Sequence, residues 1–229
     1  IIEGHLKIAA SSVPSAYLLP QLLLSFHQKY PTVSFSVLLR DSKQVLENIR
    51  DYSFDLGFSG TPPRKRIGLG YVKLIEDELI IAASPKFKFS GTKTEEKNTK
   101  LIPLKLDACL GSPFLLRESG SATRKVFEDA LKKYCRGNNK INLNVIAYLE
   151  SQEAIKEAVK KGLGITVISQ KAVEEELEAG TIRGYTLPEL KLKRNFYLVF
   201  RKKRILPPLS QAFLDYTVNF FQPAQTINS

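Results

Sequence analysis

Apolar residues in the first third of the chain alternate between short runs typical of strands and stretches at helical spacing. After the run Leu6 to Ala10, Ser11-Ser12-Val13-Pro14 offers a hydroxyl cap and a proline suited to a first helical turn. We expect strands at 6–10, 33–39 and 54–58. A helix is expected to carry Leu19, Leu22, Leu23 and Phe26 and to end at Tyr30-Pro31. A second helix, capped by Asp41 or Ser42, is expected to carry Val45, Leu46 and Ile49. The order strand, helix, strand, helix, strand predicts a right-handed, doubly wound α/β unit.

The same alternation restarts after an extended segment at 71–83 and a polar connection at 84–100. Further elements are expected as strands at 114–116, 144–148, 164–168 and 196–200 and as helices at 122–134 (ended by Gly137-Asn138-Asn139), after Ser151, at 171–179 and at 209–221. The extended segments near 78–83 and 195–200 are natural crossovers between two lobes. A fold of this kind binds small ligands in a cleft at the carboxyl ends of its strands.

Hydroxyl residues lie between a predicted strand and a helix N-terminus in two places, Ser11-Ser12 and Ser119-Gly120-Ser121-Ala122-Thr123-Arg124. Free backbone N–H groups and the positive end of the helix dipole favour an anion at such a position. Helix capping is the preferred interpretation of Ser11, Ser121 and Ser151 when each is taken alone. One such turn in each lobe favours an anion site. Arg124 reaches the anion or lies on the surface, and both interpretations stay open.

Composition supports a globular protein. The chain has 229 residues, of which 43% are hydrophobic and 25% charged, enough for one large or two small domains. Its apolar stretches are shorter than a membrane span, and the N-terminal sequence lacks the basic and apolar regions of a signal peptide. The sequence contains no methionine, so we expect it to be part of a longer protein.

The charge balance is basic, with 34 Lys and Arg against 23 Asp and Glu, or +11. Local clusters occur at Arg64-Lys65-Arg66 and Arg201-Lys202-Lys203-Arg204. Such runs can contact nucleic acid, but no recognition helix, zinc finger or aromatic RNA-binding motif accompanies them. Solvated surface loops are therefore the preferred interpretation, and the charge would still assist capture of a small anion or proximity to DNA.

Residues for metal binding or catalysis are scarce. Cys109 and Cys135, with His5 and His27, form no metal-ligand pattern, and two cysteines without a disulfide framework favour a reducing cytoplasm. Neither histidine has a nucleophile and carboxylate partner in the sequence pattern. The two thiols are either a redox pair or ordinary free cysteines, and Glu76-Asp77-Glu78 is interpreted as solvated. We expect no metal, no cofactor and no enzymatic activity.

Several segments, in their order and spacing, resemble the effector-binding domain of LysR-type transcriptional regulators. They are Gly4-His5-Leu6-Lys7-Ile8-Ala9-Ala10-Ser11, Tyr17-Leu18-Leu19-Pro20 with Phe26 and Tyr30-Pro31, Phe54-Asp55-Leu56-Gly57, Arg117-Glu118-Ser119-Gly120-Ser121-Ala122-Thr123-Arg124, and Ser151-Gln152-Glu153-Ala154-Ile155 leading to Gly162-Leu163-Gly164-Ile165. The resemblance runs from about Gly4 to Phe221. It implies two doubly wound, Rossmann-like subdomains joined by two crossover strands (the type 2 periplasmic-binding-protein-like fold), one formed by residues 1–79 and 197–229 and the other by residues 80–196.

The resemblance also implies a function. Members of this family are bacterial regulators in which an effector bound between the lobes changes how a homodimer or homotetramer sits on DNA, so the chain is expected to be cytoplasmic, without membrane contact. An N-terminal winged helix-turn-helix, absent from this chain, would contact the DNA. The version of the motif at 117–124 is similar to that of members linked to sulfur and carbon assimilation, which indicates a small anionic effector. The implied effector-binding residues are Ser11, Ser12, Ser59, Gly60, Glu118, Ser119, Ser121 and Thr123.

The first lobe departs from the family pattern at Val13-Pro14-Ser15, where many members have hydroxyl, glycine or amide residues. The helix at about 14–30 is expected to pack against the partner's second lobe through an exposed stripe of Leu19, Leu23 and Phe26, although an internal core face explains the stripe equally well. A solute-binding protein of a transporter is the main alternative function. A two-lobed enzyme is a third, for which the sequence offers no convincing catalytic group.

Overall fold

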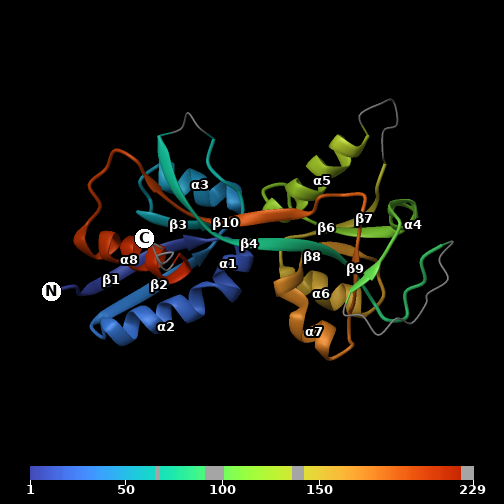
Figure 1. Cartoon of the computed structure of the whole chain (residues 1–229), viewed down its shortest axis with the longest axis horizontal. Helices are drawn as coiled ribbons and strands as arrows, with labels where there is room; N and C mark the ends of the chain where they lie inside the picture. The colour runs from blue at the N-terminus through green and yellow to red at the C-terminus, as the bar shows by residue number, and fades with distance from the viewer. Residues whose placement is uncertain (65–67, 91–100, 136–141, 223–229) are drawn as a thin grey trace, which may run out of the picture. The chain divides into compact units, whose positions relative to one another are not determined.

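The structure, a computed structural model, describes residues 1–64, 68–90, 101–135 and 142–222. The chain divides into two units, unit 1 formed by Ile1–Glu76 with Asn195–Ser229 and unit 2 by Asp77–Arg194. These bounds lie within a few residues of the expected ones. Two strands continue from one unit into the other, β4 (Leu69–Ala83) and β10 (Lys193–Arg201), and they are neighbours in the sheet (Figure 1). The segments expected as crossovers, 78–83 and 195–200, lie within these two strands.

Unit 1 has the predicted order of strands and helices. Its elements are β1 (Gly4–Ala10), α1 (Ser12–Tyr17), α2 (Leu19–Lys29), β2 (Val33–Leu39), α3 (Ser42–Arg50), β3 (Leu56–Ser59) and α8 (Pro208–Phe221), with the unit-1 parts of β4 and β10. The strand β1 lies between β2 and β3 and is parallel to both, whereas β10 pairs with β3 antiparallel. Parallel neighbours direct the carboxyl ends of β1, β2 and β3 toward the same edge of the sheet.

The core of unit 1 follows from the alternation along β1. Leu6, Ile8 and Ala10 face one side and pack with α2 and α8, while Val45 and Ile49 of α3 approach Gly57 on the other side. The stripe predicted to be exposed on α2 belongs to this core. Leu19 and Phe26 are buried at 1% and 0% exposure and Leu23 packs partly buried against them, so the internal core face is the correct interpretation.

The single helix expected at about 14–30 is two helices, because the chain breaks at Leu18 between α1 and α2. Pro20 stands in the first turn of α2. Its nitrogen carries no hydrogen to donate to the carbonyl four residues earlier, and its ring would clash with that carbonyl. The proline therefore starts a new helix instead of continuing the first.

The strands of unit 2 belong to two sheets, part of the eight-stranded sheet that also includes strands of unit 1 and a two-stranded parallel sheet. The elements of unit 2 are β5 (Leu101–Pro103), α4 (Leu106–Leu110), β6 (Pro113–Arg117), α5 (Ala122–Tyr134), β7 (Asn144–Leu149), α6 (Gln152–Lys160), β8 (Thr166–Ser169), the 3-10 helix η1 (Gln170–Val173), α7 (Glu174–Glu178) and β9 (Arg183–Thr186). Residues of α4 and α5 share one apolar cluster, and residues of α6, α7 and η1 share another. The short β5, α4 and β9 carry too little periodicity to be predicted, and the terminator at 137–139 lies outside the described residues.

The strands β6 and β8 approach each other closely at Gly164. Leu115 N donates to Ile165 O and Ile165 N donates to Pro113 O, both at 2.8 Å. A Cβ atom on Gly164 would lie 2.5 Å from the carbonyl oxygen of Pro113, so only glycine fits there. This contact places the carboxyl end of β6, where the predicted hydroxyl turn begins, beside β8.

Candidate ligand-binding site

The predicted site residues of unit 1 meet at the carboxyl edge of its sheet. The parallel register pairs Ala10 with Phe58, and Ser11 N donates to Phe58 O at 2.9 Å. Ser11 and Ser59 therefore follow directly from neighbouring strand ends. Ser11 is buried and stands at the N-cap position of α1, yet its side chain makes no capping hydrogen bond. Capping does not explain the Ser11 hydroxyl.

The end of β3 is fixed by a second pair of serines. Ser59 is fully buried, and its Oγ accepts a hydrogen bond from Thr61 N at 3.1 Å. Gly60 N donates to Ser42 Oγ at 3.1 Å, and Ser42 is itself buried at the first position of α3. Sequence analysis considered Ser42 only as a cap. The structure shows Asp41 as the cap of α3 and Ser42 as the residue that holds the loop after β3.

In unit 2 the predicted turn follows β6 and leads into α5. Ser121 N donates to Glu118 O at 3.1 Å, and Ser121 Oγ accepts from Arg124 N at 3.5 Å. Ser119 is exposed and Ser121 buried. The carboxylate of Glu118 receives two hydrogen bonds from the guanidinium of Arg117, at 2.7 and 2.9 Å. Capping is thus an observed role of Ser121, and Ser151 caps α6 in the same way.

Thr123 connects this turn to a buried polar network that sequence analysis missed. The Thr123 hydroxyl accepts from Arg194 Nη1 at 3.0 Å, and Arg194 Nε donates to Asp77 Oδ2 at 2.8 Å. Ser169 Oγ donates to the other oxygen of Asp77 at 2.6 Å. All four residues are at most 7% exposed. They join the start of α5, the end of β8, and both crossover strands at their unit-2 ends.

Electrostatics explain why the two buried charges of this network are paired. Burial lowers the pKa of the Arg194 guanidinium from its ordinary value, and the neighbouring carboxylate of Asp77 opposes that shift. A buried charge of either sign is stable only when it is paired and hydrogen-bonded. The ion pair and its two hydroxyl partners meet that requirement for Asp77.

The expectation that the acidic cluster 76–78 is solvated is wrong for Asp77, which is 1% exposed. Its neighbours Glu76 and Glu78 are exposed. Alternation could have indicated this, because Asp77 shares its side of β4 with Leu79 and Ile81. The same signal marks Arg194, which stands between Leu192 and Phe196 on the buried side of the chain.

Arg124 is engaged inside unit 2. Its Nε donates to Glu128 Oε1 at 2.7 Å, its Nη1 donates to Arg117 O at 3.2 Å, and its Cζ lies 4.7 Å from the ring centroid of Tyr148. These contacts orient the guanidinium along α5 and beside the end of β6. They hold the carboxyl end of β6, from which the turn 118–123 starts.

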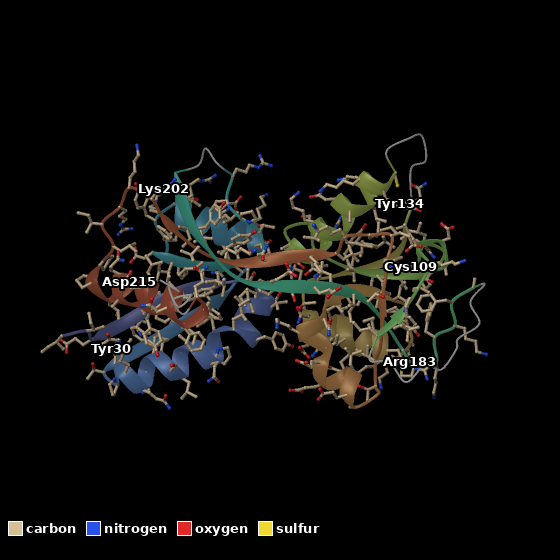
Figure 2. The ribbon with its side chains drawn as sticks, viewed as in Figure 1. Tyr30, Cys109, Tyr134, Arg183, Lys202 and Asp215 are labelled. Atoms are coloured by element: carbon tan, nitrogen blue, oxygen red, sulfur yellow. The ribbon has the colours of Figure 1, made fainter. Side chains whose placement is uncertain are left out.

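Other candidate chemistry is limited. Cys109 is fully buried on α4, and burial, with a contribution from Glu189, raises the pKa of its thiol to about 12, which disfavours the reactive thiolate (Figure 2). The described residues contain no group of three or more His, Cys, Asp or Glu that could hold a metal ion. No described helix is long and apolar enough to cross a membrane. The two hydroxyl-rich strand edges remain the polar features best placed to bind a small ligand.

Comparison with known proteins identifies relatives of the chain. CmpR, an HTH-type transcriptional activator of Synechocystis, is 30% identical over 93% of this chain and 65% of its own length. The regulatory domain of CcmR from Synechocystis PCC6803, solved in complex with 2-PG, is 25% identical with a TM-score of 0.81, covering 98% of this chain and 99% of that one. The effector-binding domain of QuiR, in complex with shikimate, shares the fold (TM-score 0.81, 16% identity, 96% and 98% coverage).

These relatives fit the architecture built from the residues. This chain spans about 65% of the length of CmpR. Its two units and crossover strands follow the type 2 periplasmic-binding-protein-like fold of the regulatory domains. Relatives that are regulators of transcription do not favour the alternative of a transporter's solute-binding protein. The family model described as the LysR substrate binding domain matches residues 2–222, and the chain therefore belongs to that family.

Proposed function

We propose that this chain is the ligand-sensing part of a LysR-type transcriptional regulator and that it binds a small anionic effector. The observation that carries the proposal is the gathering of hydroxyl and backbone N–H groups at the carboxyl ends of parallel strands in each unit. Such strand edges are the usual ligand sites of doubly wound sheets. The proposed contacts are Ser11, Ser12, Ser59 and Gly60 of unit 1 and Glu118, Ser119, Ser121 and Thr123 of unit 2.

Unit 2 provides the stronger attraction for an anion. The helix α5 extends from Ala122 to Tyr134, long enough for its dipole to present a positive end at Ser121. Arg194 lies directly behind Thr123, at 3.0 Å from its hydroxyl. A hydroxyl that accepts a bond from a guanidinium becomes a better donor toward a ligand. Thr123 is therefore proposed to pass the polarisation of Arg194 to the effector.

The carboxylate of Glu118 would repel an anion if it were unpaired. The bidentate contact with Arg117 compensates its charge, so Glu118 is proposed as part of the turn that presents no free negative charge to the effector. In unit 1 the buried Ser11 hydroxyl, which makes no capping bond, is proposed as the principal side-chain donor.

The remaining properties concern the whole protein. We propose that effector binding changes how a homodimer or homotetramer holds DNA, that the DNA is contacted through a winged helix-turn-helix outside this chain, and that the protein acts in the cytoplasm. CmpR, an HTH-type transcriptional activator, supports this proposal. Neither enzymatic activity, nor a cofactor, nor membrane contact is part of it.

The test is thermal unfolding of this chain against sulfate, thiosulfate, phosphate, acetylserine-type precursors, short carboxylates, shikimate and 2-PG, the last because it is bound to the CcmR domain. A ligand at about 100 times its Kd stabilises the folded state by roughly 2.7 kcal/mol, which raises Tm by about 5 to 10 °C. Ser11→Ala and Ser121→Ala are expected to reduce this shift.

Ser151→Ala is the matched control for Ser121→Ala. Both serines accept a bond from the backbone N–H three residues on, at 3.2 and 3.5 Å, so both substitutions cost similar stability. Only Ser121→Ala should also weaken the ligand-dependent shift. An equal ligand response in both variants, or no response to any compound in the panel, would contradict the anion site.

A further inference from the structure

Of the two basic clusters of the sequence, Arg201-Lys202-Lys203-Arg204 ends β10 and forms the turn after it, within unit 1. Arg64, the described residue of the other cluster, follows β3. Lys202 N donates to Gly68 O at 3.1 Å, which places the turn after β10 beside the start of β4. Figure 2 labels Lys202 on this turn. Arg64, Lys202, Lys203 and Arg204 are exposed, and Arg201 is half-buried.

Arg201, Lys203 and Arg204 line a hollow of about 720 Å³ together with Tyr52, Gly68 and Ile205. We call these six residues, with Lys202, the Tyr52 patch. The patch belongs to unit 1, and none of its residues is among the proposed effector contacts. Asp55 is the carboxylate in contact with it, 3.1 Å from Arg204 Nη1. The cations of the patch therefore outnumber the acid that touches them.

Tyr52 occupies a backbone conformation that disfavours a side chain. Its φ is +64°, directly after Asp51 at the C-cap of α3, where glycine is the usual residue. The ring is 65% exposed, so core packing does not account for the choice of tyrosine. A strained backbone with an exposed aromatic ring indicates that the ring itself is needed at this position.

The ring orients two guanidinium groups. Arg201 Cζ lies 3.3 Å from the ring centroid of Tyr52 and Arg204 Cζ lies 5.5 Å from it. Arg201 Nε also donates to Ile49 O at 3.0 Å. Both side chains are thereby held in place before any ligand arrives. Preorganised arginines at the mouth of a basic hollow suit bidentate contacts to phosphate oxygens.

We propose that the Tyr52 patch binds the sugar–phosphate backbone of duplex DNA without reading its sequence. A small effector needs one or two cations in an enclosed site, whereas four consecutive cations at the end of β10 match the closely repeated charge of a duplex. The chain also belongs to a family whose relative CmpR regulates transcription, which brings it close to DNA. The patch adds to the affinity that the DNA-reading domain supplies.

Fluorescence anisotropy of a labelled duplex of mixed sequence, titrated with this chain at several salt concentrations, tests the proposal. Each phosphate contact contributes about −0.9 to the slope of log K against log salt. The double variant Lys202→Gln, Lys203→Gln changes two exposed side chains. We expect it to reduce the magnitude of the negative slope by about 2 and the affinity at low salt by at least about tenfold. Lys132→Gln with Lys133→Gln, exposed on α5 in unit 2, is the charge-matched control and should bind as the unaltered chain does.

Tyr52→Gly tests whether the tyrosine ring contributes to DNA affinity independently of folding stability. Glycine accepts a φ of +64° without strain, so Tm should stay constant or rise while DNA affinity falls several-fold. The effector-dependent Tm shift should be intact in every patch variant, so the two proposals fail independently. Equal DNA binding by patch and control variants would overturn the proposal. So would binding of an acidic peptide or of anionic vesicles in the absence of any binding to the duplex.

Discussion

The carboxyl edges of the two sheets use different means to present polar groups. In unit 1, Ser11 and Ser59 follow parallel neighbouring strands, and the contacts around them are hydroxyls and backbone N–H groups. In unit 2, Thr123 is backed by the buried ion pair of Arg194 and Asp77. The first edge presents hydroxyls and backbone groups, whereas the second is backed by a buried ion pair in a low-dielectric interior.

For the anion binding that we propose, this difference predicts separate roles for the two units. A buried guanidinium that is already paired and hydrogen-bonded attracts an anion without being reorganised by it, and it is costly to disturb. Hydroxyls supply directed hydrogen bonds that cost less to lose. We therefore expect unit 2 to contribute most of the attraction for the proposed anion and unit 1 to contribute its orientation.

The largest effect should come from Asp77→Ala. The substitution leaves the Arg194 guanidinium buried without its carboxylate, and removing one partner of a buried pair costs about 3–5 kcal/mol. Urea unfolding measures the loss. The comparison in unit 1 is Asp55→Ala, which breaks a partly exposed pair with Arg204 and a hydrogen bond from Ser210, and it should cost about 1–3 kcal/mol. A similar loss in both variants would remove the distinction between the edges.

Thr123→Val tests the hydroxyl that links the ion pair to the turn. Valine keeps the shape but leaves Arg194 Nη1 without this acceptor inside the protein, at a cost of about 1–3 kcal/mol. Ser59→Ala removes the acceptor for Thr61 N, where water can replace it because Thr61 is half-buried, so about 1 kcal/mol or less is expected. A lower urea midpoint for Ser59→Ala than for Thr123→Val would contradict the expected difference between the two edges.

The two N-cap serines should differ by a smaller amount. Ser121→Ala removes an observed capping bond and should cost about 1 kcal/mol. Ser11→Ala removes no capping bond and should cost roughly 0.5 kcal/mol or less. Calorimetric Tm values check this. A larger loss of stability for Ser11→Ala than for Ser121→Ala would mean that the Ser11 hydroxyl stabilises the fold and is not free to bind a ligand.

The smallest expected effect concerns pH and belongs to unit 2, which contains both cysteines. Burial raises the pKa of Cys109 from 9.0 to about 12. The unfolded thiol loses its proton first, so the stabilisation is complete below pH 9 and is lost as pH rises toward 12. At pH 9.5 the loss is roughly 0.8 kcal/mol. Urea unfolding at pH 7 and 9.5 should show this increment in the unaltered chain and not in Cys109→Ala.

Helices and strands with strong periodicity were predicted closely. The sequence predicts a strand at 33–39 and a helix at 122–134, and the structure contains β2 and α5 at those residues. Apolar spacing and caps are local properties, so these elements can be read without tertiary information. The break at Leu18 was missed because the apolar spacing continues across it, although Pro20 is the residue that causes it.

The polar network was missed for a different reason. The side of β4 on which Asp77 lies is visible in the alternation with Leu79 and Ile81, but its partner Arg194 is far away in the sequence. A carboxylate in an acidic run is normally solvated. Only the partner makes its burial favourable, and no local pattern identifies that partner.

The sequence by itself determined the order of the elements, the two-unit division and the family, because these depend on hydrophobic periodicity, caps and motif spacing along the chain. The tertiary structure decided which polar groups meet. It joined Thr123 to Arg194 and Asp77, and it brought Arg201 and Arg204 over the ring of Tyr52. The physical reason is that burial and pairing of charges depend on contacts between distant segments, whereas helix and strand formation depend on neighbours in the chain.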